Sequence, residues 1–360
     1  MTNSSPLRAG DWVQVRSKAE ILATLDKNGH FEQLPFMPEM FQFCGQRFRV
    51  FRRAHKTCDP PNGLLGRRML HAVHLENLRC GGEAHDGCQA RCLLFWKDAW
   101  LKRVDGNTEP ESEAPQRTSV NNAPATASSG CTEQDVVVAT RVPAAQADSD
   151  EPRYVCQSTQ IREATQPLHW WDVRHYVEDY TSGNVRLSQL LAAFFFFLYD
   201  QMASAGLGLG SFLRGLYDLF QKARGRTPYP LRPGEIPAGV RTPSARLDVQ
   251  PGDLVKIRSH REILATLTEQ RHNRGMVFDP EMVPYCGGTY RVLDRVTKII
   301  NEKTGKMQHL KNDCIMLEKV VCLARYAKYR RFCPRSIYAY WREIWLEGVE
   351  LQAAGPTRRG

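Results

Sequence analysis

The pattern of apolar and polar positions repeats along the chain. Residues 10–50 and 252–292 align without a gap at an offset of 242 positions, and 20 of the 41 aligned residues are identical. Each copy opens with a Gly-Asp pair, after which apolar and polar residues alternate. A period of two is typical of a strand that buries one face. The sequence therefore predicts two homologous modules, each beginning with a turn and a strand.

A short helix is predicted after the first strand of each module. Ser17 stands three residues before Glu20, and Ser259 stands three residues before Glu262. This spacing predicts a capping box, in which each side chain of the pair accepts a hydrogen bond from the backbone N–H of the other residue.

Two tryptophans four residues apart stand near the end of each module, Trp96 and Trp100 in the first copy and Trp341 and Trp345 in the second. On a helix this spacing places both indoles on one face. We therefore expect each module to end in an amphipathic helix packed against a small barrel. In the second module, Asn301–Lys306 has the composition of a hairpin turn.

These elements predict an α+β protein with two small β-barrel modules that resemble the Src-homology-three and KOW class of barrels. The modules are joined by a linker and a helical segment. The expected organisation is a first module at 1–104, a linker at 105–165, a helical segment at 166–224, a Pro- and Gly-rich connector at 225–249 and a second module at 250–360.

The predicted linker differs from both modules in composition. Residues 105–155 are rich in Ala, Pro, Ser and Thr, and they include nine acidic and three basic residues. A stretch with so few apolar residues buries too little surface to offset the entropy lost on ordering. We therefore expect residues 105–165 to be disordered.

A run of ten apolar residues, LLAAFFFFLY, stands at 190–199 in the helical segment. The run is shorter than the roughly 20 residues of a membrane-spanning helix, so no transmembrane span is expected. Two interpretations stay open: a helix buried in the core, and a helical region at 186–220 that makes peripheral contact with a membrane or binds a partner.

The chain of 360 residues has a formal net charge of +10. This excess is compatible with an acidic partner but does not select one. The first residues lack the charged and apolar regions of a secretory signal, so we expect a cytoplasmic location. A reducing compartment argues against structural disulfides.

The chain resembles a group of uncharacterised bacterial proteins. Three stretches carry the resemblance: GDWVQVRSKAEILATLD (Gly10 to Asp26), INEKTGKM (Ile300 to Met307) and FCPRSIYAYWREIWLE (Phe332 to Glu347). The match runs over both modules and the helical segment. It implies a bacterial source and two cysteine-containing barrel-like modules, and it assigns no activity or catalytic residue.

The eleven cysteines are the strongest chemical signal. Three positions coincide in the two modules, namely Cys44 with Cys286, Cys80 with Cys322, and Cys88 with Cys333. Zinc takes four nitrogen, sulfur or oxygen ligands in a tetrahedron. The candidate ligands are Cys44, Cys80, His85, Cys88 and Cys92 in the first module, and Cys286, Cys314, Cys322 and Cys333 in the second. We therefore expect up to two zinc ions per chain. Buried, inert cysteines and an iron–sulfur or redox centre are the alternatives.

Four further residues are interpreted less specifically. Glu39 and Glu281 occupy equivalent Pro-Glu-Met motifs, where a carboxylate serves either as a residue of a helix start or as a site acid. Cys131 and Cys156 lie outside both modules and have no counterpart, so no ligand role is predicted for them.

Basic residues alternate with aromatic ones in one stretch of each module. The candidates are Arg47, Arg49, Arg52 and Arg53 in the first module, and Arg325, Lys328, Arg330 and Arg331 in the second. This pattern suits contacts with a nucleic-acid backbone and its bases. A solvated face and an acidic protein or membrane surface are the alternatives.

The chain contains no phosphate loop, dinucleotide fingerprint, HExxH or G-x-S-x-G motif. The favoured hypothesis is a non-enzymatic, metal-stabilised adaptor that binds a protein partner through its paired modules. A nucleic-acid-binding regulator and a zinc- or thiol-dependent enzyme with its site in the first module are the alternatives.

Overall fold

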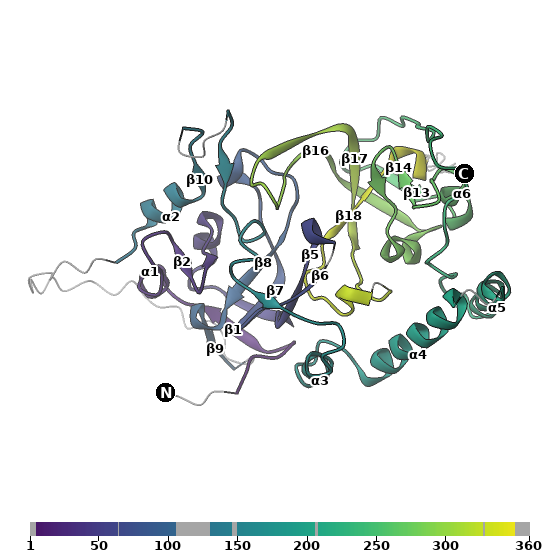
Figure 1. Ribbon diagram of the computed structural model, residues 1–360. Helices are drawn as coiled ribbons and strands as arrows, with labels where there is room; N and C mark the ends of the chain where they lie inside the picture. The colour runs from purple at the N-terminus through teal and green to yellow at the C-terminus, as the bar shows by residue number, and fades with distance from the viewer. Residues whose placement is uncertain are drawn as a thin grey trace, which may run out of the picture. The chain divides into compact units, whose positions relative to one another are not determined.

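A computed structural model describes residues 5–63, 65–105, 130–145, 150–205, 208–326 and 328–349 (Figure 1). The chain forms two compact units. The first comprises Met1–Leu190, Ile300–Gln308 and Phe332–Arg335, and the second comprises Leu191–Ile299, His309–Arg331 and Ser336–Gly360. The fold is mixed α+β, with many strands, few helices and a curled sheet (Figure 1).

The first unit is built on a five-stranded antiparallel sheet in the order β8–β7–β4–β1–β9. Its strands are β1 (Trp12–Val15), β4 (Arg47–Arg53), β7 (Ala72–Arg79), β8 (Leu93–Lys97) and β9 (Leu101–Arg103). Val13 and Val15 alternate with more exposed residues on β1 and are fully buried, as the period of two predicts.

Shorter elements surround this sheet. The helices are α1 (Lys18–Leu22), α2 (Glu133–Ala139) and α3 (Arg174–Thr181), and the 3-10 turns are η1 (Pro38–Phe43), η2 (Pro60–Asn62), η3 (Glu83–His85) and η4 (Asp98–Trp100). The short strands are β2 (His30–Phe31), β3 (Leu34–Pro35), β5 (Lys56–Asp59), β6 (Leu65–Arg68), β10 (Arg141–Val142), β11 (Arg153–Tyr154) and β12 (Gln166–Pro167). Strands β12, β6 and β5 form a three-stranded sheet, and β2–β3 and β10–β11 are pairs.

The second unit contains a five-stranded sheet in the order β18–β17–β16–β13–β19. Its strands are β13 (Leu254–Ile257), β16 (Thr289–Ile300), β17 (Met307–Val321), β18 (Tyr338–Trp341) and β19 (Leu346–Gly348). The other elements are α5 (Gly210–Ala223), α6 (His260–Leu264), β14 (His272–Asn273), β15 (Met276–Val277), η5 (Pro280–Tyr285), η6 (Lys328–Arg330) and η7 (Glu343–Trp345). Helix α4 (Leu187–Ser204) begins in the first unit and continues in the second.

The same strand pairing occurs in both five-stranded sheets. Val13 pairs with Phe48 on β4, and Val255 pairs with Tyr290 on β16, which are positions offset by 242 residues. The last strand pairs with the first strand in each sheet, β9 with β1 and β19 with β13.

Both predicted capping boxes are confirmed. The Ser17 hydroxyl accepts a hydrogen bond from the Glu20 N–H, and the Glu20 carboxylate accepts one from the Ser17 N–H at 2.9 Å. Ser259 and Glu262 make the same two bonds at the start of α6. The hairpin turn at 301–306 is also confirmed, since the Asn301 N–H donates to the Lys306 carbonyl at 2.9 Å.

The predicted C-terminal helix of each module is wrong. Trp96 lies in β8 and Trp100 in η4, while Trp341 lies in β18 and Trp345 in η7. All four indoles are fully buried. A strand followed by one 3-10 turn also directs two residues four positions apart into the core. Because the five residues of β8 are all buried, the alternation that would have indicated a strand is missing.

The disorder predicted at 105–165 does not hold where the structure describes that region. Helix α2 begins with a capping box at Thr132, and Val136 and Ile161 are buried in the core of the first unit. The Gln157 side chain bonds both backbone groups of Phe95, at 2.8 Å and 2.9 Å. These few specific contacts order a stretch that is poor in apolar residues. Residues 106–129 and 146–149 lie outside the described residues.

Residues 166–224 contain β12 and the helices α3, α4 and α5, and 225–249 contains no regular helix or strand. The apolar run lies in α4, where Ala203 near the helix end is buried but Phe194 and Phe195 are exposed. Among the described residues, no helix combines the length and the apolar character needed to cross a bilayer.

Candidate metal centre

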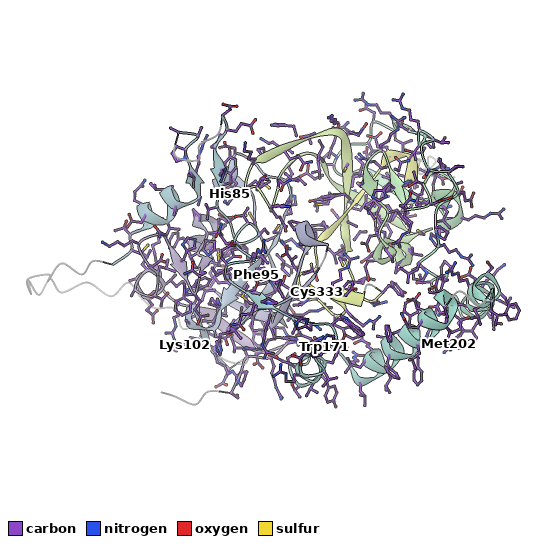
Figure 2. All side chains as sticks on the ribbon, in the orientation of Figure 1. His85, Phe95, Lys102, Trp171, Met202 and Cys333 are labelled. Atoms are coloured by element: carbon purple, nitrogen blue, oxygen red, sulfur yellow. The ribbon has the colours of Figure 1, made fainter. Side chains whose placement is uncertain are left out.

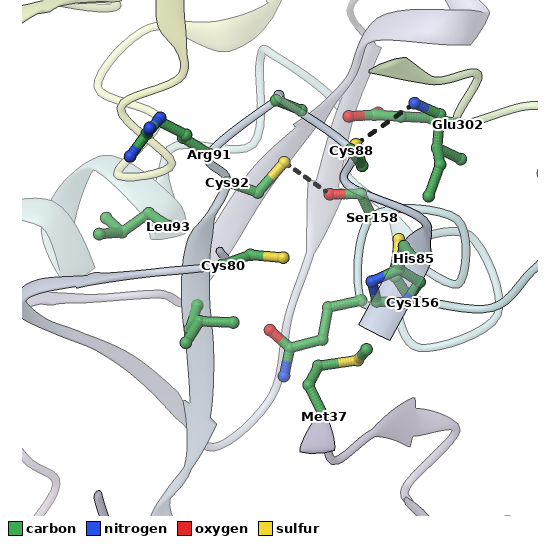
Figure 3. Close-up of a pocket in the computed structure, with 14 residues that line it drawn as sticks. Met37, Cys80, His85, Cys88, Arg91, Cys92, Leu93, Cys156, Ser158 and Glu302 are labelled. Atoms are coloured by element: carbon green, nitrogen blue, oxygen red, sulfur yellow. Dashed lines mark hydrogen bonds between the residues drawn. The ribbon is translucent and has the colours of Figure 1, made fainter. Parts of the chain in front are cut away.

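A cavity of about 40 Å³ in the first unit gathers most of the ligands predicted for the first module (Figure 3). Its lining includes Cys80, His85, Cys88 and Cys92, together with Cys156. These four cysteines carry free thiols. A cavity of this size has room for an ion with a bound water, or for a few waters.

The loop between β7 and β8 places these side chains. Cys80 follows the end of β7, and its N–H donates to the carbonyl of Cys92 at 2.8 Å. Gly82 then turns the chain at φ +80°, where a Cβ would lie 2.0 Å from the carbonyl oxygen of Cys88. Because only glycine fits this turn, the chain can fold back so that His85 on η3 lies beside Cys80.

Glu39, Cys80 and His85 form the centre of the candidate site. One ligand atom from each lies within 4.8 Å of the other two. The Cys80 thiol donates a hydrogen bond to Glu39 Oε1 at 2.9 Å. Glu39 Oε2 is buried and has no hydrogen-bond partner among the described residues. A buried carboxylate oxygen without a donor costs free energy unless a cation or a donor satisfies it.

The chemistry of this trio fits zinc. Carboxylate oxygen, thiolate sulfur and imidazole nitrogen are its three usual protein ligands, at about 2.0–2.3 Å from the metal. Burial raises the pKa of Cys80, and the negative charge of Glu39 acts in the same direction. The thiol therefore keeps its proton when no cation is bound, and that proton is shared with Glu39. A divalent cation would displace it, because thiolate is the form that coordinates metal.

Cys92 lines the same cavity, although its sulfur is not among the ligand atoms that lie within 4.8 Å of one another. The Ser158 hydroxyl donates to Cys92 Sγ at 3.3 Å (Figure 3). Arg335 donates to the Ser158 oxygen at 2.9 Å. Arg335 is itself held by Glu302, with nitrogen and oxygen 2.5 Å apart. Burial raises the pKa of the Cys92 thiol, while Arg335 and Ser158 act in the opposite direction. Burial has the larger effect, so the pKa of Cys92 lies above its usual value and the thiol keeps its proton.

The remaining first-module cysteines differ in position. Cys88 Sγ accepts a hydrogen bond from the Ile300 N–H at 3.3 Å at the edge of the cavity. Burial raises the pKa of Cys156 to about 12, and Cys92 acts in the same direction. Cys44 follows η1 and is half-buried, and it does not line the cavity.

The cysteines predicted as ligands in the second module are not brought together in the same way. Cys314 lies 3.6 Å from the sulfur of Met276, and Cys286 lies 4.0 Å from the carbonyl of Met282. Cys333 belongs to the first unit, whereas Cys286, Cys314 and Cys322 belong to the second. Within the described ranges, the group of three metal-binding side chains that the structure contains is that of Glu39, Cys80 and His85.

A guanidinium occupies the corresponding region of the second unit. Glu281 is the counterpart of Glu39, and it accepts the N–H groups of Arg325 and Tyr326 at 2.8 Å and 2.6 Å. Burial lowers the pKa of Arg330, but the charges of Cys322, Asp279 and Glu281 outweigh this effect and raise it. The Glu281 carboxylate and Cys322 therefore have a buried cation beside them.

Two of the basic residues predicted to bind nucleic acid are buried in ion pairs. Arg53 is buried and pairs with Asp98 at 3.1 Å, and the buried Arg330 pairs with Asp279, so neither can reach a phosphate. Arg49 and Arg325 are exposed, whereas Arg47, Arg52 and Arg331 are partly buried. The side chain of Lys328 lies outside the described set.

A second buried polar cluster lies between β5 and α3 in the first unit. The Lys56 ammonium donates to Asp179 and lies 3.1 Å from His175 Nδ1, and His55 Nε2 lies 3.2 Å from Asp179 Oδ1. Burial lowers the pKa of Lys56, although Asp179 counteracts this effect. The Tyr176 ring, 5.1 Å from Lys56 Nζ, helps to enclose it. We interpret the cluster as a structural link.

Sequence reasoning missed part of the site. No partner residue for the Glu39 carboxylate was evident from the sequence. Its hydrogen bond with Cys80 joins residues 41 positions apart. Nothing in the local sequence marked Cys156, Ser158 or Arg335. No family model matches the chain, and comparison with curated proteins and with solved structures finds no match either.

Proposed function

We propose that this chain is a non-enzymatic, metal-stabilised binding protein whose first unit holds one zinc ion. The ligands are Glu39, Cys80 and His85, with Cys92 as the fourth. The observation that carries the proposal is the trio of buried His85 with partly buried Glu39 and Cys80, together with the unpartnered and buried Glu39 Oε2. The number of ions is one per chain instead of the two that the cysteine count suggested.

The duplicated sequence supports this proposal. In the second unit, Arg330 supplies a positive charge to the Glu281 and Cys322 region. Glu39 and Cys80 occupy the equivalent positions in the first unit. There the Cys80 thiol donates its hydrogen bond to the Glu39 carboxylate. A divalent cation in the first unit would do what the guanidinium does in the second.

We further infer that the two units contain homologous, Src-homology-three-like modules. The aligned residues and the matching strand order and register support this assignment. Two related sheets in one chain would present two related surfaces to a protein partner, which raises the effective concentration of the second contact after the first has formed.

A zinc- or thiol-dependent enzyme is the second candidate. A cavity beside three ligands leaves room for a water on the metal, as in catalytic zinc sites, and the Cys92 sulfur at the same cavity accepts a hydrogen bond from Ser158. The two candidates differ in whether Cys92 completes the coordination shell or stays free to react.

Metal analysis of the purified full-length chain tests the proposal. We expect about one zinc per chain, and less than a fifth of that in Cys80→Ser and in His85→Ala. Cys322→Ser is the matched control, because it changes the equivalent cysteine of the second unit and leaves the zinc content unchanged. Circular dichroism confirms that each variant is folded.

Two results would overturn the proposal: wild-type protein that is metal-free after growth with zinc, or equal zinc loss in Cys80→Ser and Cys322→Ser. Alkylation separates the two candidates. Protection of Cys92 by zinc indicates a complete structural site, whereas rapid labelling of Cys92 in the zinc-loaded protein indicates the enzyme.

A further inference from the structure

Two helices of the second unit present large apolar side chains to solvent. We define the α4–α5 face by its exposed residues, Leu191, Phe194, Phe195, Leu198 and Met202 on α4, and Phe212, Leu216, Leu219 and Phe220 on α5. Phe195 is 64% exposed and Leu219 is 67% exposed. Figure 2 draws these side chains, and its Met202 label marks the face on α4. Apolar side chains grouped in this way are typical of a binding surface.

On the side opposite the α4–α5 face, aromatic residues pack the two helices against each other and against the rest of the second unit. The ring centroids of Tyr199 on α4 and Tyr217 on α5 lie 5.6 Å apart, and Phe196 lies 5.1 Å from Tyr326. Tyr217 also packs on Tyr229 at 5.6 Å. The inner face therefore holds the helices in place, and the outer face stays available for a partner.

The residues outside the described ranges offer little to cover this face. Outside the described residues the sequence has five large apolar side chains, Met1, Leu64, Val120, Leu207 and Leu351, and these are widely separated. A segment that covered nine large apolar residues would need a comparable apolar surface of its own. These scattered residues do not form such a segment.

Positive charge adjoins the apolar residues. Lys222 in the last turn of α5, and Arg224 and Arg226 just after the helix, are exposed. The Arg224 guanidinium lies 5.1 Å from the centre of the Phe220 ring, so the cationic and apolar groups are in contact. No acidic residue occurs between Leu219 and Gly234.

We propose that the α4–α5 face binds the surface of an anionic lipid bilayer. Its Phe, Leu and Met side chains enter the boundary between headgroups and acyl chains, and Lys222, Arg224 and Arg226 contact the anionic headgroups. Helices with an apolar face rich in Phe and Leu, and with adjoining basic residues, bind bilayers in this way. The proposal is independent of the metal site, which lies in the first unit.

Vesicle sedimentation with the full-length chain tests the proposal. The probes are vesicles of phosphatidylcholine alone and vesicles with about one third phosphatidylserine. We expect binding to the anionic vesicles, at least tenfold weaker binding to the neutral ones, and weaker binding at high salt because the charge contribution is screened.

Two variants separate the contributions. Phe195→Asp with Leu219→Asp lowers binding to anionic vesicles at least tenfold, and Lys222→Gln with Arg224→Gln and Arg226→Gln removes the preference for phosphatidylserine. Val137→Asp with Val138→Asp is the matched control, since it places two charges at exposed apolar positions on α2 of the first unit. Light scattering measures the oligomeric state of each protein.

Wild-type protein that stays in the supernatant with anionic vesicles overturns the proposal. So does equal loss of binding in the α2 control. A stable dimer that Phe195→Asp with Leu219→Asp converts to monomer also overturns it, because the face would then bind a second copy of the chain.

Discussion

Asp179 on α3 is fully buried and forms an ion pair with Lys56 on β5, although the two residues lie 123 positions apart. His175, one turn earlier on α3, contacts the same ammonium group. The pair therefore fixes the segment after the linker region against the three-stranded sheet of the first unit.

Removing one member of this pair leaves the other charge buried without compensation. We expect Asp179→Ala to lower the free energy of unfolding by about 3–5 kcal/mol. The double variant Lys56→Met with Asp179→Leu should lose less, because neither charge remains. Urea denaturation measures both, and a loss under 1 kcal/mol for Asp179→Ala would contradict a structural role.

His74 makes stability depend on pH. Burial lowers its pKa to about 3, and its Nδ1 donates to the Leu94 carbonyl at 2.8 Å. In the unfolded chain the pKa of histidine is about 6.5, so between these values the unfolded state binds a proton that the folded state does not. The free energy of unfolding therefore falls as pH falls from 6.5 toward 3, by up to about 1.4 kcal/mol per pH unit.

His74→Phe removes this proton and should reduce that slope between pH 6 and pH 4. Burial also lowers the pKa of His175 and of His260 to about 4, so part of the pH dependence persists in the variant. His169→Phe, at an exposed ring, serves as the control for replacing a histidine by phenylalanine. Equal slopes in wild type and His74→Phe would show that His74 is charged in the folded protein.

Arg330 tests the comparison between the two units. Arg330→Met leaves Asp279 and Glu281 without their cation, and we expect the free energy of unfolding to fall by about 3 kcal/mol. Zinc content should stay at the wild-type value, because the candidate ligands lie in the first unit. If Arg330→Met keeps the wild-type free energy of unfolding but loses its zinc, the ion does not bind at Glu39, Cys80 and His85.

The capping serines give a prediction for both units. Ser17→Ala and Ser259→Ala each remove the side-chain acceptor of a helix N-terminus, and each should cost about 1 kcal/mol. Ser17→Asp and Ser259→Asp, which keep an acceptor at the cap, should restore most of that loss. If only one alanine variant is destabilised, the two caps differ in importance despite their equal geometry.

The features that could be predicted from the sequence are local. The capping boxes depend on residues three positions apart, and the turn at Asn301–Lys306 depends on its own composition. The grouping of Cys80, His85, Cys88 and Cys92 was also predictable, because one short loop carries all four.

The features that could not be predicted depend on distant residues or on burial of both faces. Gln157 orders the region after the linker by bonding Phe95, and neither residue marks the other in the sequence. Glu39 becomes a candidate ligand only when η1 meets the loop after β7. Trp96 lies in a strand with no exposed position, so its spacing to Trp100 fits a helix equally well.

Arg335 and Ile300, which contact Ser158 and Cys88 in the first unit, and Glu302, which pairs with Arg335, are made late during translation. Ribosomes add about 5–20 residues per second, so the 145 residues between Leu190 and Arg335 take roughly 7–30 s to synthesise. During that interval the nascent chain carries Cys88 and Cys92 without the groups that later enclose them. These thiols are then open to oxidation and to premature metal capture, and a protein released before residue 335 would keep them in that state.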